Sequence, residues 1–102
     1  MADNQFKIVW SRPARQDFKR IISQIAATAP LNAARFGTAM LRAVESLGWS
    51  PLRCPVLFET PTCRYLLFKK YRIVFQADEQ KSLVHIVAIL FPYQQFDLLN
   101  TE

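Results

Sequence analysis

Four cationic side chains lie at the start of the most apolar stretch of the chain, residues 64–91. These strand cations are Arg64, Lys69, Lys70 and Arg72. Guanidinium and ammonium groups bind phosphates and carboxylates, so the cluster predicts a site for an acidic ligand or partner. The rest of the stretch is rich in β-branched and aromatic residues, which favour buried strands. This contrast is the main indication of function in the sequence.

A second group of cations, here called the basic strip, consists of Arg12, Arg15 and Lys19. Spacings of three and four residues place them on one face of a helix. Such a strip is either a solvated helix face or a contact surface for a partner, and the spacing leaves both open. The single histidine, His85, lies among valines and isoleucines, so we expect a packed or edge-facing side chain there.

Length and composition predict one globular domain, residues 1–102, with a single core. Of the 102 residues, 51% are hydrophobic and 21% are charged, and the formal net charge is +5. The charge is uneven, because residues 7–72 hold twelve cations and three acids, whereas residues 73–102 hold one cation and four acids. A small basic domain usually meets nucleic acid, an acidic protein segment or a membrane surface. Ordinary solvation of lysine and arginine is the alternative.

The sequence predicts neither a metal site nor a cofactor. Cys54 and Cys63 are nine residues apart, and one histidine cannot complete a zinc site with them. A disulfide between them is possible but not implied. The first residues lack the pattern of a signal peptide, and no apolar run approaches the ~18 residues that span a bilayer. We therefore expect a cytoplasmic protein with free thiols and no membrane partner.

A short strand at residues 6–10 should be followed by a first helix. Ser11 is a suitable N-cap and Pro13 suits the first turn, so this helix should run to about Thr28. Its expected apolar stripe consists of Ala14, Phe18, Ile21, Ile22 and Ile25.

A second helix should follow the break at Ala29-Pro30 and run from about Leu31 to Leu47, with Gly48 as the stop. Its stripe consists of Ala33, Phe36, Met40, Val44 and Leu47. Two amphipathic helices with so short a connection should form an antiparallel hairpin.

Three strands are expected in the second half of the chain, at residues 64–69, 71–77 and 83–91, with a polar turn at residues 78–82. The last strand is apolar on both alternating sets, so it should be covered on both faces. The two expected sets are Val84, Ile86, Ala88 and Leu90, and Leu83, Val87, Ile89 and Phe91.

The segments that flank these strands are less regular. Residues 49–62 contain three prolines and should form an irregular connection, with a short extended piece at residues 56–58. In the tail, Phe96, Leu98 and Leu99 should either dock on the domain or remain exposed.

The element order predicts an α+β fold of type β-α-α-β-β-β. We expect a small, mostly antiparallel sheet that includes the N-terminal strand, with the helical hairpin packed on one face. The other face should be concave, because sheets twist.

Several local phrases, in this order, resemble the RelE/ParE superfamily of toxins from type II toxin–antitoxin modules. The phrases are Val9-Trp10-Ser11 with Ala14 and Asp17-Phe18, Ala29-Pro30 with Ala33 and Phe36, Leu47 with Ser50-Pro51, and Arg64 with Tyr71-Arg72-Ile73-Val74-Phe75. The resemblance covers roughly residues 6–91 and is closer to ParE than to RelE. It implies a toxin that is neutralised by a cognate antitoxin.

The superfamily implies two mechanisms. RelE-like members cleave messenger RNA at the ribosome, and ParE-like members bind DNA gyrase. Metal-free RNA cleavage needs a base, an acid and cations for the phosphate. For a nuclease, the resemblance implies Arg72 and Arg64 as the phosphate-binding residues and Tyr93 as an acid or base. However, a further basic position is occupied by Leu66, and the end of the last strand is Phe91-Pro92.

This incomplete set of catalytic residues favours the ParE-like mechanism, in which the strand cations and the basic strip contact the target. A toxin-fold protein that binds partners without being toxic is the third hypothesis.

Overall fold

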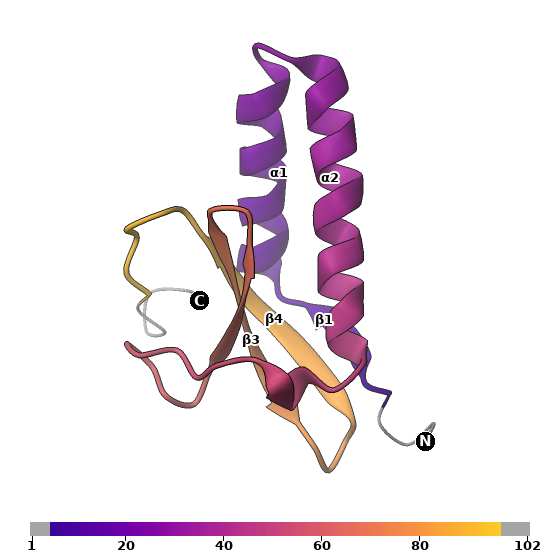
Figure 1. Cartoon of the computed structure of the whole chain (residues 1–102), viewed down its shortest axis with the longest axis vertical. Coiled ribbons are helices and arrows are strands. Elements are labelled where there is room, and N and C mark those ends of the chain that lie inside the picture. Colours follow the sequence, from indigo (N-terminus) through magenta and orange to yellow (C-terminus); the bar gives the residue numbers. More distant parts are fainter. Residues whose placement is uncertain (1–4, 97–102) are drawn as a thin grey trace.

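Four strands and two long helices form the part of the chain that this computed structural model describes, residues 5–96 (Figure 1). They are β1 (Lys7–Trp10), α1 (Arg12–Ala26), α2 (Pro30–Glu45), β2 (Arg64–Phe68), β3 (Tyr71–Asp78) and β4 (Leu83–Leu90). The short 3-10 turns η2 (Ser46–Gly48) and η3 (Pro51–Arg53) follow α2. The sheet order is β1-β4-β3-β2, with β1 parallel to β4 and the other pairs antiparallel. The expected β-α-α-β-β-β fold is confirmed.

Local signals set the boundaries of α1. The Ser11 hydroxyl accepts a hydrogen bond from the backbone N–H of Ala14 (3.1 Å), as an N-cap does, and Pro13 lies in the first turn. The helix ends at Ala26, slightly before the expected end at Thr28.

The second helix begins at Pro30 and ends at Glu45, and η2 then carries Leu47 into the core. The carbonyl oxygen of Gly48 accepts a hydrogen bond from the N–H of Phe6 (2.7 Å), so the chain passes very close to the segment before β1. A Cβ on Gly48 would lie 2.9 Å from the Phe6 carbonyl oxygen, which explains why glycine occupies this position.

The helical hairpin covers one face of the sheet and extends well beyond it, so that the α1–α2 connection lies far from the strands (Figure 1). The buried side chains on the helical side of the core are Ala14, Ile21, Met40, Val44 and Leu47. Against them pack Tyr71, Ile73, Phe75, Val84, Ile86 and Ile89 from β3 and β4. Within residues 5–96, neither helix has the length and apolarity that crossing a bilayer requires.

The opposite face of the sheet is covered by the connection before β2 and by the segment after β4. The buried side chains there are Leu57, Cys63, Val74, Ala88, Leu90 and Phe96. Leu57 donates its N–H to the carbonyl of Cys63 (2.8 Å), and Val56 pairs with Arg64 as an isolated bridge. Burial of β4 on both faces and docking of Phe96 are therefore confirmed. The face that was expected to be concave is covered at its centre by these side chains. Leu98 and Leu99 lie outside the described residues.

The expected division of β4 into two alternating sets is wrong beyond Ile86. Val74 pairs with Ala88 and Phe75 pairs with Ile86, so Val87 is an extra residue in a β-bulge. One extra residue moves every later side chain to the opposite face. Ile89 therefore packs under the helices, and Ala88 and Leu90 pack on the far face.

Side chains of the N-cap residue Ser11 and of α1 replace strand pairing beside this bulge, because β1 is paired with β4 only as far as Ile86. The Ser11 hydroxyl donates a hydrogen bond to the Val87 carbonyl (3.1 Å), and the Asp17 carboxylate accepts one from the Ile89 N–H (2.9 Å). These backbone groups of β4, which lie beyond the end of β1, are thus satisfied by the side chains of the N-cap residue and of α1.

Candidate functional site

Arg72, the residue with the strongest resemblance to a phosphate-binding arginine, is engaged by an internal carboxylate. Its two terminal nitrogens donate to the two carboxylate oxygens of Glu59 (3.1 and 3.0 Å), and one of them also donates to the Gln94 carbonyl (2.6 Å). The hydrogen bonds from Arg72 lower the pKa of Glu59 below its ordinary value of 4.5. Glu59 also accepts a bond from the N–H of Phe96 (3.4 Å). The pair therefore fastens the connection and the C-terminal segment to β3.

Arg64 is not brought together with Arg72. It is paired with Phe75, whose side chain lies under the helices, whereas Arg72 is paired with Leu90, which packs on the far face. Directly paired residues point to the same side of a sheet, so the two arginines point to opposite sides. Arg64 donates a hydrogen bond to the Cys54 carbonyl (2.7 Å). The two arginines cannot hold one phosphate in this arrangement.

Lys69 and Lys70, two of the strand cations, form the tight turn between β2 and β3. Lys69 has a φ angle of 53°, in the left-handed region, and its ammonium group lies 5.6 Å from the ring centre of Phe68. Both lysines are exposed. They present positive charge at the tip of this hairpin without an ion pair to any of residues 5–96.

Tyr93 lies in the turn that follows β4 and is fully exposed, at 101% of its reference area. Its φ angle is 68°, and the turn is closed by a hydrogen bond from the Gln94 N–H to the Phe91 carbonyl (3.1 Å). Because Arg72 binds the carbonyl of Gln94, Tyr93 is one residue away from a contact of Arg72. Its predicted role as an acid or base stays a prediction.

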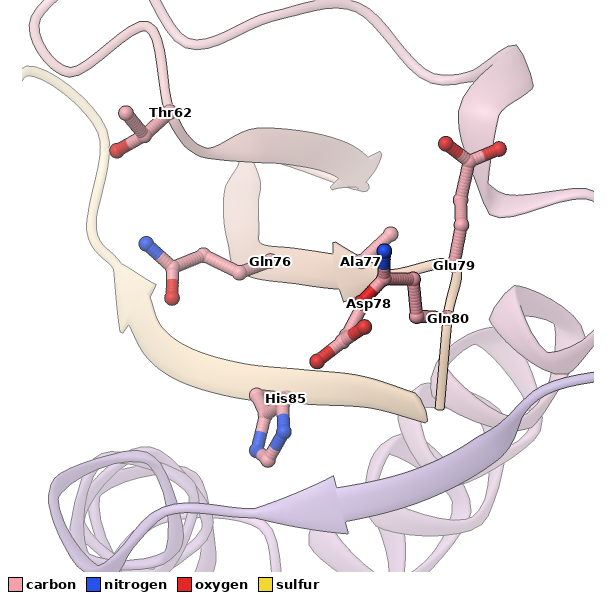
Figure 2. A pocket seen from close by; sticks show the side chains of 7 residues that line it. All are labelled: Thr62, Gln76, Ala77, Asp78, Glu79, Gln80 and His85. Carbon is pink, nitrogen blue, oxygen red and sulfur yellow. The ribbon is translucent and has the colours of Figure 1, made fainter. Parts of the chain in front are cut away.

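His85 lines a polar pocket of about 520 Å³. This pocket lies on the sheet face to which Arg72 points, but at the end of the sheet near the β3–β4 turn. Figure 2 shows Gln76 and His85 on neighbouring strands, with Thr62 across from Gln76 and with Asp78 and Glu79 toward the β3–β4 turn. A strand rises about 3.4 Å per residue, so Gln76, the partner of His85, lies about 14 Å from Arg72. His85 and Arg72 therefore cannot act on one phosphate.

The basic strip borders an apolar pocket at the junction of three elements. Trp10 from β1, Phe18 from α1 and Leu41 from α2 line it together with Arg15 and Lys19, and its volume is about 230 Å³. The rings of Trp10 and Phe18 meet edge to face at 5.8 Å. We call this site the Trp10 pocket. Arg12, Arg15 and Lys19 are all exposed, as the helical spacing predicted.

Sequence reasoning did not identify Glu59 or the Trp10 pocket. Glu59 is the sole acid between Glu45 and Asp78, in a segment that holds five cations. This pattern could have predicted that Glu59 forms an ion pair with one of those cations. No pattern in the sequence indicated that Leu41 lines the Trp10 pocket, because its position there depends on how α2 packs beside α1. Cys54 and Cys63 are both free and buried, and burial raises the pKa of each thiol.

Solved structures share this arrangement of strands and helices. The chromosomal ParDE toxin–antitoxin system of P. aeruginosa contains a chain with a TM-score of 0.77 and 17% identity, covering 87% of this chain and 98% of that one. The RelBE2 toxin–antitoxin complex of Mycobacterium tuberculosis gives a TM-score of 0.62 at 18% identity, covering 88% and 94%. The intact E. coli RelBE toxin–antitoxin complex gives 0.57 at 17% identity, covering 88% and 99%. The chain therefore shares its fold with chains of the ParDE and RelBE toxin–antitoxin structures.

Residues 8–91 match the family model described as the ParE toxin of the type II toxin–antitoxin system parDE. The chain belongs to this family of toxins. No curated protein sequence matches it significantly.

Proposed function

We propose that this toxin acts in the cytoplasm by binding a macromolecular target, with DNA gyrase as the first candidate, and that a cognate antitoxin neutralises it. One observation supports binding over catalysis: Arg72 is held by Glu59 and points away from the side on which Arg64 lies. A metal-free nuclease needs several such groups around one phosphate. The antitoxin partner is supported by the similar folds found in ParDE and RelBE toxin–antitoxin structures.

Induced expression in bacteria tests the target. We expect filamentation and DNA damage while transcripts stay intact, and we expect the purified protein to inhibit DNA supercoiling by gyrase. Rapid cleavage of messenger RNA with intact DNA would overturn the gyrase proposal. The absence of any growth defect would instead favour a non-toxic, partner-binding member of the fold.

A RelE-like nuclease is the second candidate, because Arg72 contacts the residue next to the exposed Tyr93. Guanidinium binds a phosphate in the same two-pronged way as a carboxylate, so Glu59 occupies the position that a phosphate would take. For a nuclease, Glu59→Gln should therefore increase RNA cleavage, whereas Arg72→Ala and Tyr93→Phe should abolish it. For a ParE-like toxin, none of the three substitutions should produce RNA cleavage.

The antitoxin is tested separately from the target. The reading frame beside the gene should encode a small acidic protein, and its co-expression should restore growth. Toxicity that persists despite co-expression and complex formation would contradict neutralisation.

A further inference from the structure

We infer that the polar pocket beside the β3–β4 turn binds a small organic cation that carries a guanidinium group. This inference goes beyond the proposed function and does not depend on the target of the toxin. The connection before β2, the strands β3 and β4 and the turn between them supply the six polar residues that line the pocket: Thr62, Gln76, Asp78, Glu79, Gln80 and His85 (Figure 2).

The volume and the length of the pocket fit a small, elongated molecule. Its volume is about 520 Å³, within the range of about 300–1,000 Å³ that is usual for small-molecule sites. Gln76 pairs with His85, so their side chains lie on the same face of adjacent strands. Asp78 follows Gln76 by two residues, which places it on the same face about 7 Å further along β3. The pocket thus has a neutral end at Gln76 and His85 and an acidic end at Asp78, and a ligand that reaches both ends must be elongated.

The charges of the pocket indicate a cationic ligand. Asp78 and Glu79 both line it, whereas none of the lysines and arginines among residues 5–96 does so. Two carboxylates without a neighbouring cation attract positive charge and repel phosphate, so the pocket does not suit a nucleotide or an RNA backbone. One oxygen of Asp78 accepts a hydrogen bond from the Lys81 N–H (3.1 Å), which holds this carboxylate at the turn. The pocket is therefore a preformed acidic site on a protein that is basic overall.

The hydrogen-bonding groups of the pocket favour guanidinium over ammonium or a metal ion. Side-chain oxygens of Thr62, Gln76 and Gln80 add acceptors to those of the two carboxylates. Guanidinium is planar and offers five N–H donors, whereas ammonium is a compact, strongly hydrated charge with three. Within the described part of the chain, no three His, Cys, Asp or Glu side chains are grouped so that they could hold a metal ion. Guanidinium therefore matches this set of acceptors best.

NMR titration of the untagged protein with agmatine, at constant pH, tests the inference. Agmatine carries guanidinium at one end and ammonium at the other. His85 is the single histidine of the chain, so its ring protons report on the pocket alone. We expect these resonances to shift saturably with a Kd of about 0.1–1 mM, as for other ligands of this small size. The neutral isostere N-carbamoylputrescine, in which urea replaces guanidinium, should bind at least about fivefold more weakly.

Two matched variants separate the pocket from general charge effects. Glu79→Lys should weaken agmatine binding at least about fivefold, because it replaces an attractive charge with a repulsive one. Glu45→Lys changes the net charge equally, but Glu45 is exposed at the end of α2 and does not line the pocket, so binding should be unchanged. Equal unfolding temperatures without ligand will show that both variants are folded. Agmatine should then raise the Tm of wild type and Glu45→Lys more than that of Glu79→Lys.

The inference is overturned if agmatine does not shift the His85 resonances, if the urea isostere binds equally tightly, or if Glu79→Lys and Glu45→Lys behave alike. It is also overturned if magnesium or inorganic phosphate binds the pocket more tightly than agmatine does. Acetyl-arginine amide, which presents guanidinium on a peptide backbone, distinguishes two sources of the ligand. Tighter binding than agmatine supports the site and assigns it to an arginine side chain of a protein segment, whereas weaker binding supports the site and assigns it to a free small molecule.

Discussion

Replacing Glu59 with glutamine should destabilise the protein by removing the charge that holds Arg72. The side chains meet through two hydrogen bonds of 3.1 and 3.0 Å, and Glu59 also accepts the N–H of Phe96. The substitution keeps the shape of the side chain and one acceptor oxygen. It leaves Arg72 with the Gln94 carbonyl and with partial access to water.

The magnitude follows from the intermediate burial of the pair. Exposed ion pairs contribute about 0–1 kcal/mol, whereas hydrogen bonds to desolvated charged groups contribute about 1.5–3 kcal/mol. The side chains of Arg72 and Glu59 are 24% and 18% exposed, so we expect a loss of about 1–2 kcal/mol. In a domain of this size that corresponds to a fall in Tm of about 4–16 °C.

The pH dependence provides a second measure of the same contact. The pKa of Glu59 lies below 4.5 in the folded protein, because Arg72 stabilises the ionised form, and near its ordinary value in the unfolded chain. The stabilisation is therefore complete above about pH 5. As the pH falls, the unfolded chain takes up the proton first, and the stabilisation is lost as the pH passes through the folded pKa. Wild type should consequently lose more stability below about pH 4.5 than Glu59→Gln does.

Urea unfolding followed by tryptophan fluorescence at pH 7 and at pH 3.5 measures both effects. Glu79→Gln, which removes an exposed carboxylate in the β3–β4 turn, is the matched control and should be neutral. A double-mutant cycle with Arg72→Gln should give a coupling of about 1 kcal/mol. Equal stability of Glu59→Gln and wild type at pH 7, or identical pH profiles, would refute the reasoning.

Three further predictions use the same unfolding assay or a thiol assay. Gly48→Ala should cost about 1–3 kcal/mol, because the added Cβ would lie 2.9 Å from the Phe6 carbonyl oxygen; an unchanged Tm would show that the backbone shifts freely. Asp17→Ala should cost about 1–3 kcal/mol by leaving the Ile89 N–H without its acceptor, and Asp17→Asn should recover part of that loss if the contact is the cause. Both cysteine thiols should react slowly with a thiol reagent at neutral pH and rapidly in urea, because they are buried and their pKa values are raised; fast reaction of the folded protein would contradict their burial.

The Arg72–Glu59 pair also explains how the far face of the sheet is closed. It joins β3 to the proline-containing connection and, through Gln94 and Phe96, to the segment after β4. A single charged contact thus fixes two irregular segments over the apolar cluster that contains Val74 and Leu90. Whether Arg72 also binds a phosphate is tested separately, by comparing RNA cleavage by the Glu59→Gln and Arg72→Ala variants.

Local patterns in the sequence were sufficient for the fold class. Capping at Ser11, the break at Ala29-Pro30 and the helical stripes depend on neighbouring residues, so the elements were predicted to within about two residues. The basic strip was predicted for the same reason, because residues three and four apart share a helix face. Two-sided burial of β4 followed from its composition.

Contacts between distant segments were decided by the tertiary structure. The bulge at Val87 arises from pairing with β3, and no local signal marks it, so the alternation rule failed beyond that residue. Glu59 lies 13 residues from Arg72, and Leu41 lies on a different helix from Phe18. The sequence by itself therefore determined which elements form and which cations are near one another in the chain. Only the packing decided that Arg64 and Arg72 point to opposite sides of the sheet, because the direction of a side chain depends on strand register. The packing also decided that Arg72 pairs with Glu59, because an ion pair depends on which distant segment folds beside the charged side chain.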